Sequence, residues 1–249
     1  MSFEGKSVLI TGGSTGIGKA VAEAFATRGA CVTIADIDSS AEQVVLNIVE
    51  NGGTAQFVQC DVSDREQVNS AIERAVNKYK TLDAAFNNAG ILPEPMPMHE
   101  VSQEAFDQIL SIDLKGVFNC MQAEIQHFLK SGGGAIVNTA SVAGIIADPN
   151  MSAYVAAKHA VVGLSKAAAV EYAQHGIRVN AIAPGLIATP MTNQWLADPT
   201  FTAAMYAHNV IGRAGQPEEI AGTVLHLLSD DASFTNGSVV VVDGGQTAH

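Results

Sequence analysis

Cysteines, basic residues and long apolar runs are all scarce in this sequence. The three cysteines, Cys31, Cys60 and Cys120, are isolated and odd in number, which favours small buried side chains over a structural disulfide. Lys and Arg number 13 against 25 Asp and Glu, so the formal net charge is -12, and no basic cluster stands out. Nucleic acid and anionic membranes are therefore not expected as partners.

Signals for export, membrane insertion and metal binding are missing as well. The N-terminal stretch MSFEGKSVLI has no signal-peptide pattern, and no apolar run approaches the roughly 20 residues of a membrane-spanning helix. The seven histidines are scattered, with neither an HExxH motif nor Cys/His spacing, so no catalytic metal is expected. The remaining expectation is a cytoplasmic protein.

The chain does contain short apolar runs that alternate with helical patterns, without linkers or repeats. Continuous Val, Ile and Ala runs separated by helices predict a parallel sheet that is covered on both faces. The expected fold class is α/β: one doubly wound, Rossmann-type domain over residues 1–249, with a seven-stranded parallel sheet and helices on both faces. Ligands of such sheets bind beyond the carboxyl ends of the strands. The predicted strands are 6–11, 31–36, 55–60, 82–88, 134–141, 177–184 and 237–245.

A glycine-rich turn, TGGSTGIGKA, follows the first predicted strand and leads into a helix. Glycines at 12, 16 and 18 permit a tight turn with positive φ and let a pyrophosphate approach the backbone amides at the helix N-terminus. Asp36 ends the second strand about 20 residues further on, where a carboxylate can accept hydrogen bonds from adenosine ribose hydroxyls. The turn and Asp36 together indicate a dinucleotide site, although Asp36 could instead be a solvated acidic residue at a strand end.

Tyr154 and Lys158 lie four residues apart in YVAAKHAVVGL and therefore share one face of a predicted helix. Moving a phenol pKa from about 10 to about 7 requires roughly 4 kcal/mol of phenolate stabilisation. One ammonium at about 4 Å supplies about that much at an effective dielectric constant near 20. The pair could thus form a proton-transfer site, or it could be a packing ring beside a snorkelling lysine stem.

Seven motifs in this order and at this spacing resemble the short-chain dehydrogenase/reductase superfamily, in its branch of about 250 residues. The resemblance runs from Lys6 to the C-terminus. The motifs are TGGSTGIG (11–18), DV (61–62), NNAG (87–90), NTASVAG (138–144), YVAAK (154–158), RVNAIAPG (178–185) and TPM (189–191).

The resemblance implies a catalytic group made of Ser141, Tyr154 and Lys158. Tyr154 would take the alcohol proton as a phenolate, Ser141 would orient the substrate oxygen, and Lys158 would lower the tyrosine pKa and bind the nicotinamide ribose. Asp113 departs from the pattern, because the family usually has asparagine there. We place it with the catalytic residues, although a carboxylate beside Lys158 would partly cancel the field acting on Tyr154.

The resemblance also implies the cofactor-binding residues. Asp61 and Val62 would flank the adenine, and Asn88, Ala89 and Gly90 would line the ribose side. Asn87, Asn138 and Asn180 are expected to tie strands and loops together. The full set is Gly12, Ser14, Thr15, Gly16, Ile17, Gly18, Asp36, Ile37, Asp61, Val62, Asn88, Ala89, Gly90, Tyr154, Lys158, Pro184, Gly185, Ile187 and Thr189.

The sequence around the ribose site favours NAD over NADP. A 2′-phosphate needs a nearby Arg or Lys, whereas this turn carries Ser14 and Thr15, and the second strand ends in Asp36 followed by Ile37. A carboxylate facing the phosphate would lose its ribose hydrogen bonds and add repulsion. We therefore expect NAD to be preferred at least about a hundredfold in kcat/KM.

The expected substrate is a neutral secondary alcohol or ketone, cyclic or aromatic in character, because the candidate pocket is mostly apolar and lacks Arg or Lys to clamp an anion. Residues 190–210 are expected to form a substrate lid, with Trp195 and Phe201 either in it or in the core. A 3-oxoacyl thioester reductase of the same superfamily and a non-catalytic nucleotide sensor are the alternatives. The resemblance implies a homotetramer formed by helices 102–130 and 152–174. The pocket segments are 90–98, 142–146, Met151, Leu186 and 191–206.

Overall fold

The computed structural model describes residues 1–248 and contains one seven-stranded, all-parallel sheet. The strand order β3-β2-β1-β4-β5-β6-β7 reverses direction of winding between β1 and β4, which confirms the predicted doubly wound fold. All seven predicted strands are present. Their bounds are β1 (Ser7–Thr11), β2 (Cys31–Asp36), β3 (Thr54–Gln59), β4 (Ala84–Asn87), β5 (Gly134–Thr139), β6 (Ile177–Pro184) and β7 (Val239–Val242).

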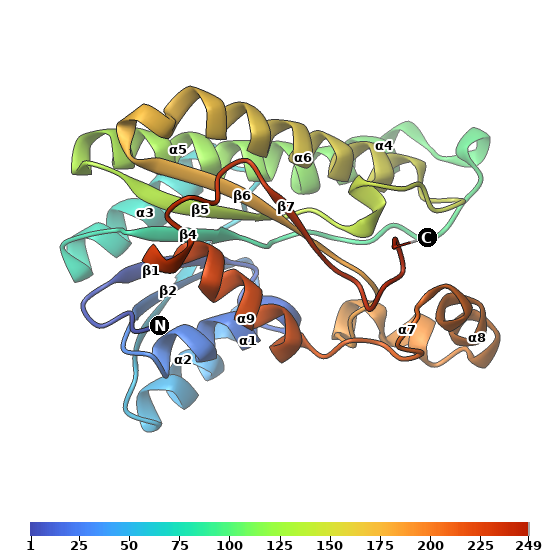
Figure 1. Ribbon diagram of the computed structural model, residues 1–249, viewed down its shortest axis with the longest axis horizontal. Helices are drawn as coiled ribbons and strands as arrows, with labels where there is room; N and C mark the ends of the chain where they lie inside the picture. The colour runs from blue at the N-terminus through green and yellow to red at the C-terminus, as the bar shows by residue number, and fades with distance from the viewer. Residues whose placement is uncertain (249) are drawn as a thin grey trace.

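Helices cover both faces of the sheet, as Figure 1 shows. One core lies between the sheet and α1, α2 and α9, and the other lies between the sheet and α3, α5 and α6. The inner strands, such as β1 and β6, are buried on both faces, which explains why they read as continuous apolar runs. The covering helices are α1 (Gly16–Ala26), α2 (Ala41–Glu50), α3 (Arg65–Tyr79), α5 (Val117–Ser131), α6 (Ser152–Tyr172) and α9 (Pro217–Leu228), whereas α4 (Gln103–Ile109) packs against α6.

Two further helices stand apart from these layers. Figure 1 places α7 (Asn193–Leu196) and α8 (Pro199–His208) beside the carboxyl ends of the strands, next to the last residues of the chain. They belong to the segment 190–210 that the sequence predicts as a lid. None of the helices described within residues 1–248 is both long and apolar enough to cross a membrane.

The predicted long helix after β4 is interrupted by a π-helical segment, Leu110–Gly116, between α4 and α5. Such bulges insert one residue per turn and often occur at functional sites. Asp113 lies in this segment and is fully buried. The bulge was not predicted, because helical periodicity does not distinguish a single π turn from continuous α-helix.

Three buried asparagines connect the strands beneath the carboxyl edge of the sheet. Asn87 on β4 donates to Asn138 on β5 over 2.9 Å, and Asn138 donates to Ser165 on α6 over 2.9 Å. Asn180 on β6 donates to the Thr235 carbonyl and accepts from the Ser238 amide. The predicted structural role of these asparagines is confirmed.

Candidate active site

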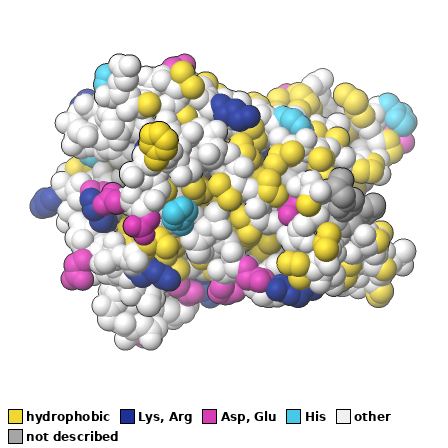
Figure 2. All heavy atoms as spheres, viewed as in Figure 1, with side chains coloured by type: hydrophobic (Ala, Val, Ile, Leu, Met, Phe, Trp, Pro, Cys, Tyr) yellow, Lys and Arg dark blue, Asp and Glu magenta, His cyan; other side chains and the backbone are white. Residues whose placement is uncertain are grey.

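A cavity of about 880 Å³ opens at the carboxyl ends of the strands. Figure 2 shows hydrophobic side chains gathered in a band across the middle of the face that Figure 1 presents. The cavity brings together all but two of the residues that the sequence predicts for the site. The exceptions are Gly18 and Asp113, which lie behind its wall.

The glycine-rich turn forms one end of this cavity. Gly12 has φ +66°, and a Cβ there would come within 2.8 Å of the Ala89 backbone. A Cβ at Gly18 would lie 2.0 Å from the Gly12 carbonyl oxygen, so Gly18 serves the packing of α1 against the turn. Among the described residues, no side chain caps the N-terminus of α1, and its first turn carries no acidic residue. Its free amides therefore fit an anionic pyrophosphate.

Asp36 is held at the edge of the turn by two backbone amides. Its carboxylate accepts from the amide of Ser14 over 2.9 Å and from the amide of Asp38 over 3.0 Å, and the residue is 7% exposed. A carboxylate has about four lone-pair sites, so acceptor capacity remains for ribose hydroxyls. Lys158, at the opposite end, is the single Lys or Arg among the described residues that line the cavity.

The central wall is tied to the turn by Asn88 and Thr11. The Asn88 amide group donates to the Gly12 carbonyl over 3.0 Å, and the Thr11 hydroxyl accepts from the Asn88 backbone amide over 3.0 Å. Asp61 accepts two hydrogen bonds from Ser63 and lines the same wall. These contacts fix the backbone that a dinucleotide would lie along.

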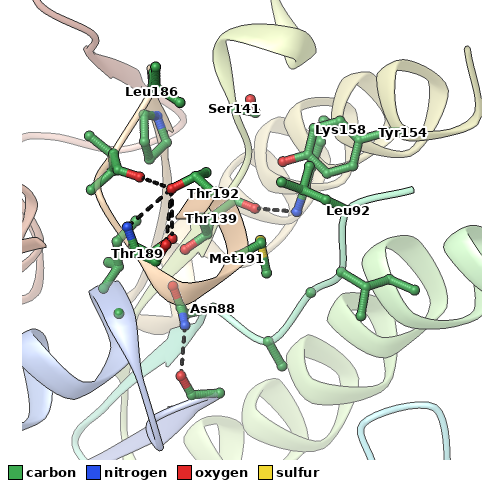
Figure 3. Close-up of a pocket in the computed structure, with 18 of the residues that line it drawn as sticks. Asn88, Leu92, Thr139, Ser141, Tyr154, Lys158, Leu186, Thr189, Met191 and Thr192 are labelled. Atoms are coloured by element: carbon green, nitrogen blue, oxygen red, sulfur yellow. Dashed lines mark hydrogen bonds between the residues drawn. The ribbon is translucent and has the colours of Figure 1, made fainter. Parts of the chain in front are cut away.

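Tyr154 and Lys158 project from the first turns of α6 toward Ser141 and Thr139, as Figure 3 shows. The Lys158 ammonium lies 5.4 Å from the Tyr154 ring centroid and donates to the Thr139 carbonyl oxygen over 3.2 Å. The Ser141 hydroxyl accepts from the Ala143 amide over 3.1 Å, which orients it at the start of a 3-10 turn. The expected pairing of Tyr154 and Lys158 on one helical face is thus present.

The pKa of Tyr154 is raised above its ordinary value, chiefly because the phenol is buried away from water. The Lys158 ammonium and the Ser141 hydroxyl oppose this effect, whereas the carboxylates of Asp113 and Asp148 add to it. The sequence argument counted the stabilising lysine and omitted the desolvation of the phenol. The pKa of Tyr154 is therefore raised, and the expected fall toward 7 is not found.

Asp113 contacts the site through Lys158 and the β4 loop. Its Oδ1 accepts from the Ile91 amide over 2.8 Å, and its buried Oδ2 has no hydrogen-bond partner within residues 1–248. Burial raises the pKa of Asp113, and the Lys158 ammonium opposes that rise. Because Asp113 does not line the cavity, it can act on the reaction only through its neighbours.

The segment 190–210 contributes one wall of the cavity. Met191, Thr192, Gln194, Trp195, Asp198, Phe201 and Met205 line it. The rings of Trp195 and Phe201 contact each other at a centroid distance of 5.2 Å with their planes tilted by 38°, and both are half-buried at the cavity rather than part of the sheet cores.

The sequence did not predict four polar residues of the cavity, Thr139, Asp148, Asn150 and Gln246. Asp148 lies in the loop between Ser141 and Tyr154, and Gln246 follows the paired glycines after β7. The position of Asp148 between two expected catalytic residues was an available signal. Gln246 carried no such signal, because only the folded chain brings the end of the sequence to this edge of the sheet.

Comparison with known proteins gives close matches over the whole chain. The family profile described as Enoyl-(Acyl carrier protein) reductase matches residues 12–247. Cyclohexanol dehydrogenase of Acinetobacter sp. (strain SE19) is 47% identical over 247 residues, covering 99% of this chain and 96% of that protein.

Solved structures also match over the whole chain. Levodione reductase is 40% identical, with a TM-score of 0.94 and 99% of both chains covered. A protein from Beutenbergia cavernae, assigned as an NAD(P)-dependent gluconate 5-dehydrogenase, was solved with NADP bound at low occupancy. It is 35% identical, with a TM-score of 0.95, and the match covers 100% of this chain and 99% of that one.

Proposed function

Because this chain belongs to the short-chain dehydrogenase/reductase superfamily, we propose that it interconverts cyclic secondary alcohols and their ketones by hydride transfer with NAD. The observation that carries the proposal is the convergence of Ser141, Tyr154 and Lys158 on one largely apolar cavity. The 47% identity to a cyclohexanol dehydrogenase and the 40% identity to a levodione reductase support a cyclic substrate.

The proposed chemistry uses the three side chains in distinct roles. In alcohol oxidation the Tyr154 phenolate takes the hydroxyl proton, and the Ser141 hydroxyl donates a hydrogen bond to the substrate oxygen. When bound, the nicotinamide ring supplies the acceptor for the hydride that leaves the carbinol carbon. The Lys158 ammonium stabilises the phenolate, and the Thr139 carbonyl oxygen holds this ammonium in place by accepting a hydrogen bond from it. In ketone reduction Tyr154 returns the proton to the oxygen.

The cofactor is a nicotinamide dinucleotide, and we propose NAD as the preferred form. The support is Asp36, whose carboxylate is fixed where the adenosine ribose would lie, together with the lack of Lys or Arg at that end among the described cavity-lining residues. The site residues predicted from the sequence would hold this cofactor. We further propose that residues 190–210 act as a substrate lid, supported by their position along one wall of the cavity.

A 3-oxoacyl thioester reductase remains the second candidate, and the description of the matching family profile favours keeping it. Such an enzyme would bind an acidic carrier protein, whereas this chain has a formal net charge of -12. The charge favours a small free substrate.

Reduced-cofactor absorbance across a substrate panel tests the proposal. We expect turnover of cyclohexanol or cyclopentanol with NAD, and of the matching ketones with NADH, at a kcat/KM at least about tenfold above that for a 3-oxoacyl thioester. Tight binding of NAD without turnover of any alcohol or ketone would support the sensor alternative instead.

We expect Asp113→Asn to move the pH profile of alcohol oxidation toward lower pH. Oxidation requires the phenolate, so the rate rises with pH through the apparent pKa of Tyr154. The Asp113 carboxylate raises that pKa, and its removal lowers it. The rate at the foot of the acid limb should increase about threefold or more. Asparagine is chosen because its side-chain oxygen can still accept the hydrogen bond from the Ile91 amide. An acid limb that stays in place or moves to higher pH would show that Asp113 does not act on Tyr154.

We propose a homotetramer in which α5 and α6 pair across subunits. Both helices expose large apolar side chains, with Phe118 46%, Leu129 45% and Val170 82% exposed. Sedimentation at micromolar concentration should give four times the mass of one chain, and Phe118→Asp should lower it while helix content is kept. A wild-type protein that sediments as a monomer would contradict this assembly.

A further inference from the structure

Asp148 is a carboxylate of the cavity wall to which the proposed reaction gives no role. It lies in the loop between the 3-10 turn Val142–Gly144 and α6, and it lines the same cavity as Ser141 and Tyr154. Its negative charge adds to the rise in the pKa of Tyr154. Because Asp148 and Tyr154 line the same cavity, a substituent on a ring bound at Tyr154 can approach the Asp148 side chain.

The Asp148 carboxylate stands without a partner in the part of the chain that the structure describes. No described residue forms a hydrogen bond or an ion pair with it, whereas Asp198, another cavity carboxylate, accepts from the Thr200 amide over 2.8 Å to cap α8. Burial raises the pKa of Asp148. Asp148 is half-buried and lines the cavity that the substrate would occupy, and it also borders a second cavity of about 500 Å³ beside Ser152 and His159.

A purely apolar ring would remove the remaining water from this carboxylate without replacing its hydrogen bonds, which is unfavourable. A ring substituent that donates a hydrogen bond would replace them. An anionic substituent would be repelled, and Lys158, the single Lys or Arg among the described cavity-lining residues, is engaged by the Thr139 carbonyl. The Asp148 carboxylate therefore favours donor-bearing ring substituents over apolar or anionic ones.

We propose that Asp148 selects cyclic alcohols that carry a second substituent able to donate a hydrogen bond, a hydroxyl or an ammonium group. This inference rests on the proposed function, because it concerns the substrate of that reaction. It assigns Asp148 to substrate recognition and makes cyclic diols and amino alcohols better substrates than the unsubstituted ring.

Steady-state kinetics with NAD on matched rings tests the inference. The panel is cyclohexanol, the 1,2-, 1,3- and 1,4-cyclohexanediols, 4-aminocyclohexanol and 4-hydroxycyclohexanecarboxylate. For the wild type, kcat/KM for the best donor-bearing ring should exceed that for cyclohexanol about tenfold or more, and the carboxylate should be the poorest substrate. The relative values for the diols and the amino alcohol show which donor the site prefers.

Two variants and a control separate recognition from general damage. Asp148→Leu should reduce the preference for donor-bearing rings about tenfold. Asp148→Asn should lower use of the amino alcohol and raise use of the carboxylate substrate, each about tenfold. Glu73→Gln removes an exposed carboxylate of α3 that does not line the cavity, and it should leave all ratios unchanged.

Ratios between substrates cancel any common effect of Asp148 on the Tyr154 pKa. Ratios that stay within about twofold of wild type in both Asp148 variants would overturn this inference while cyclohexanol turnover still supported the proposed function. A wild type without turnover of any ring would instead overturn the proposed function itself.

Discussion

Tyr154→Phe is expected to lower kcat for alcohol oxidation by at least about a hundredfold while NAD affinity changes little. The substitution removes the hydroxyl that takes the substrate proton and keeps the ring that packs at the start of α6. The Lys158 ammonium would remain on the Thr139 carbonyl, 3.2 Å away, and would still be available to the cofactor ribose. Initial rates of the absorbance change of the reduced cofactor give kcat. Quenching of Trp195 fluorescence follows NAD binding.

Tyr172→Phe is the matched control for this substitution. Tyr172 lies at the other end of the same helix and does not line the cavity. Loss of the Tyr172 hydroxyl should leave kcat within about twofold of wild type. If Tyr154→Phe also retained near-normal kcat, Tyr154 would not be the proton-transfer group.

The second large effect is a preference for NAD over NADP of at least about a hundredfold in kcat/KM. A 2′-phosphate at the ribose site would face the Asp36 carboxylate, which is fixed by the amides of Ser14 and Asp38 and cannot easily turn away. Lost ribose hydrogen bonds and like-charge repulsion together cost about 3 kcal/mol or more, which corresponds to this ratio.

Asp36→Ala should narrow the preference to about tenfold or less by improving the use of NADP and weakening that of NAD. Asp38→Ala is the control, because Asp38 is an exposed neighbour whose carboxylate accepts from the Ser40 amide outside the cavity. A relative from Beutenbergia cavernae was solved with NADP bound, so the cofactor preference of this chain has to be measured with both cofactors. Equal or better kcat/KM with NADP in the wild type would remove the role given to Asp36.

The fold was predictable because burial on both faces of a parallel strand leaves a continuous apolar run, and all seven runs became strands. The ends of those runs were equally informative. Asp36 ends β2 and Ser141 follows β5, and the parallel order brings both to one edge of the sheet. Local chemistry at strand ends therefore located most of the cavity.

The features that were missed depend on tertiary surroundings. The raised pKa of Tyr154 follows from burial of the phenol, which spacing along a helix cannot reveal. The π-helical segment at Asp113 follows the same periodicity as the helices around it. Gln246 reaches the cavity only because the last residues of the chain return to the carboxyl edge of the sheet.

Direct transfer of hydrogen from the carbinol carbon is the most direct test of the account. Cyclohexanol carrying deuterium at that carbon should, with this protein and NAD, give reduced cofactor one mass unit heavier than that formed from ordinary cyclohexanol, together with cyclohexanone in equal amount. Mass spectrometry of the reduced cofactor measures the label. Unlabelled reduced cofactor, or ketone formed without cofactor reduction, would contradict hydride transfer between the ring carbon and the nicotinamide in this cavity.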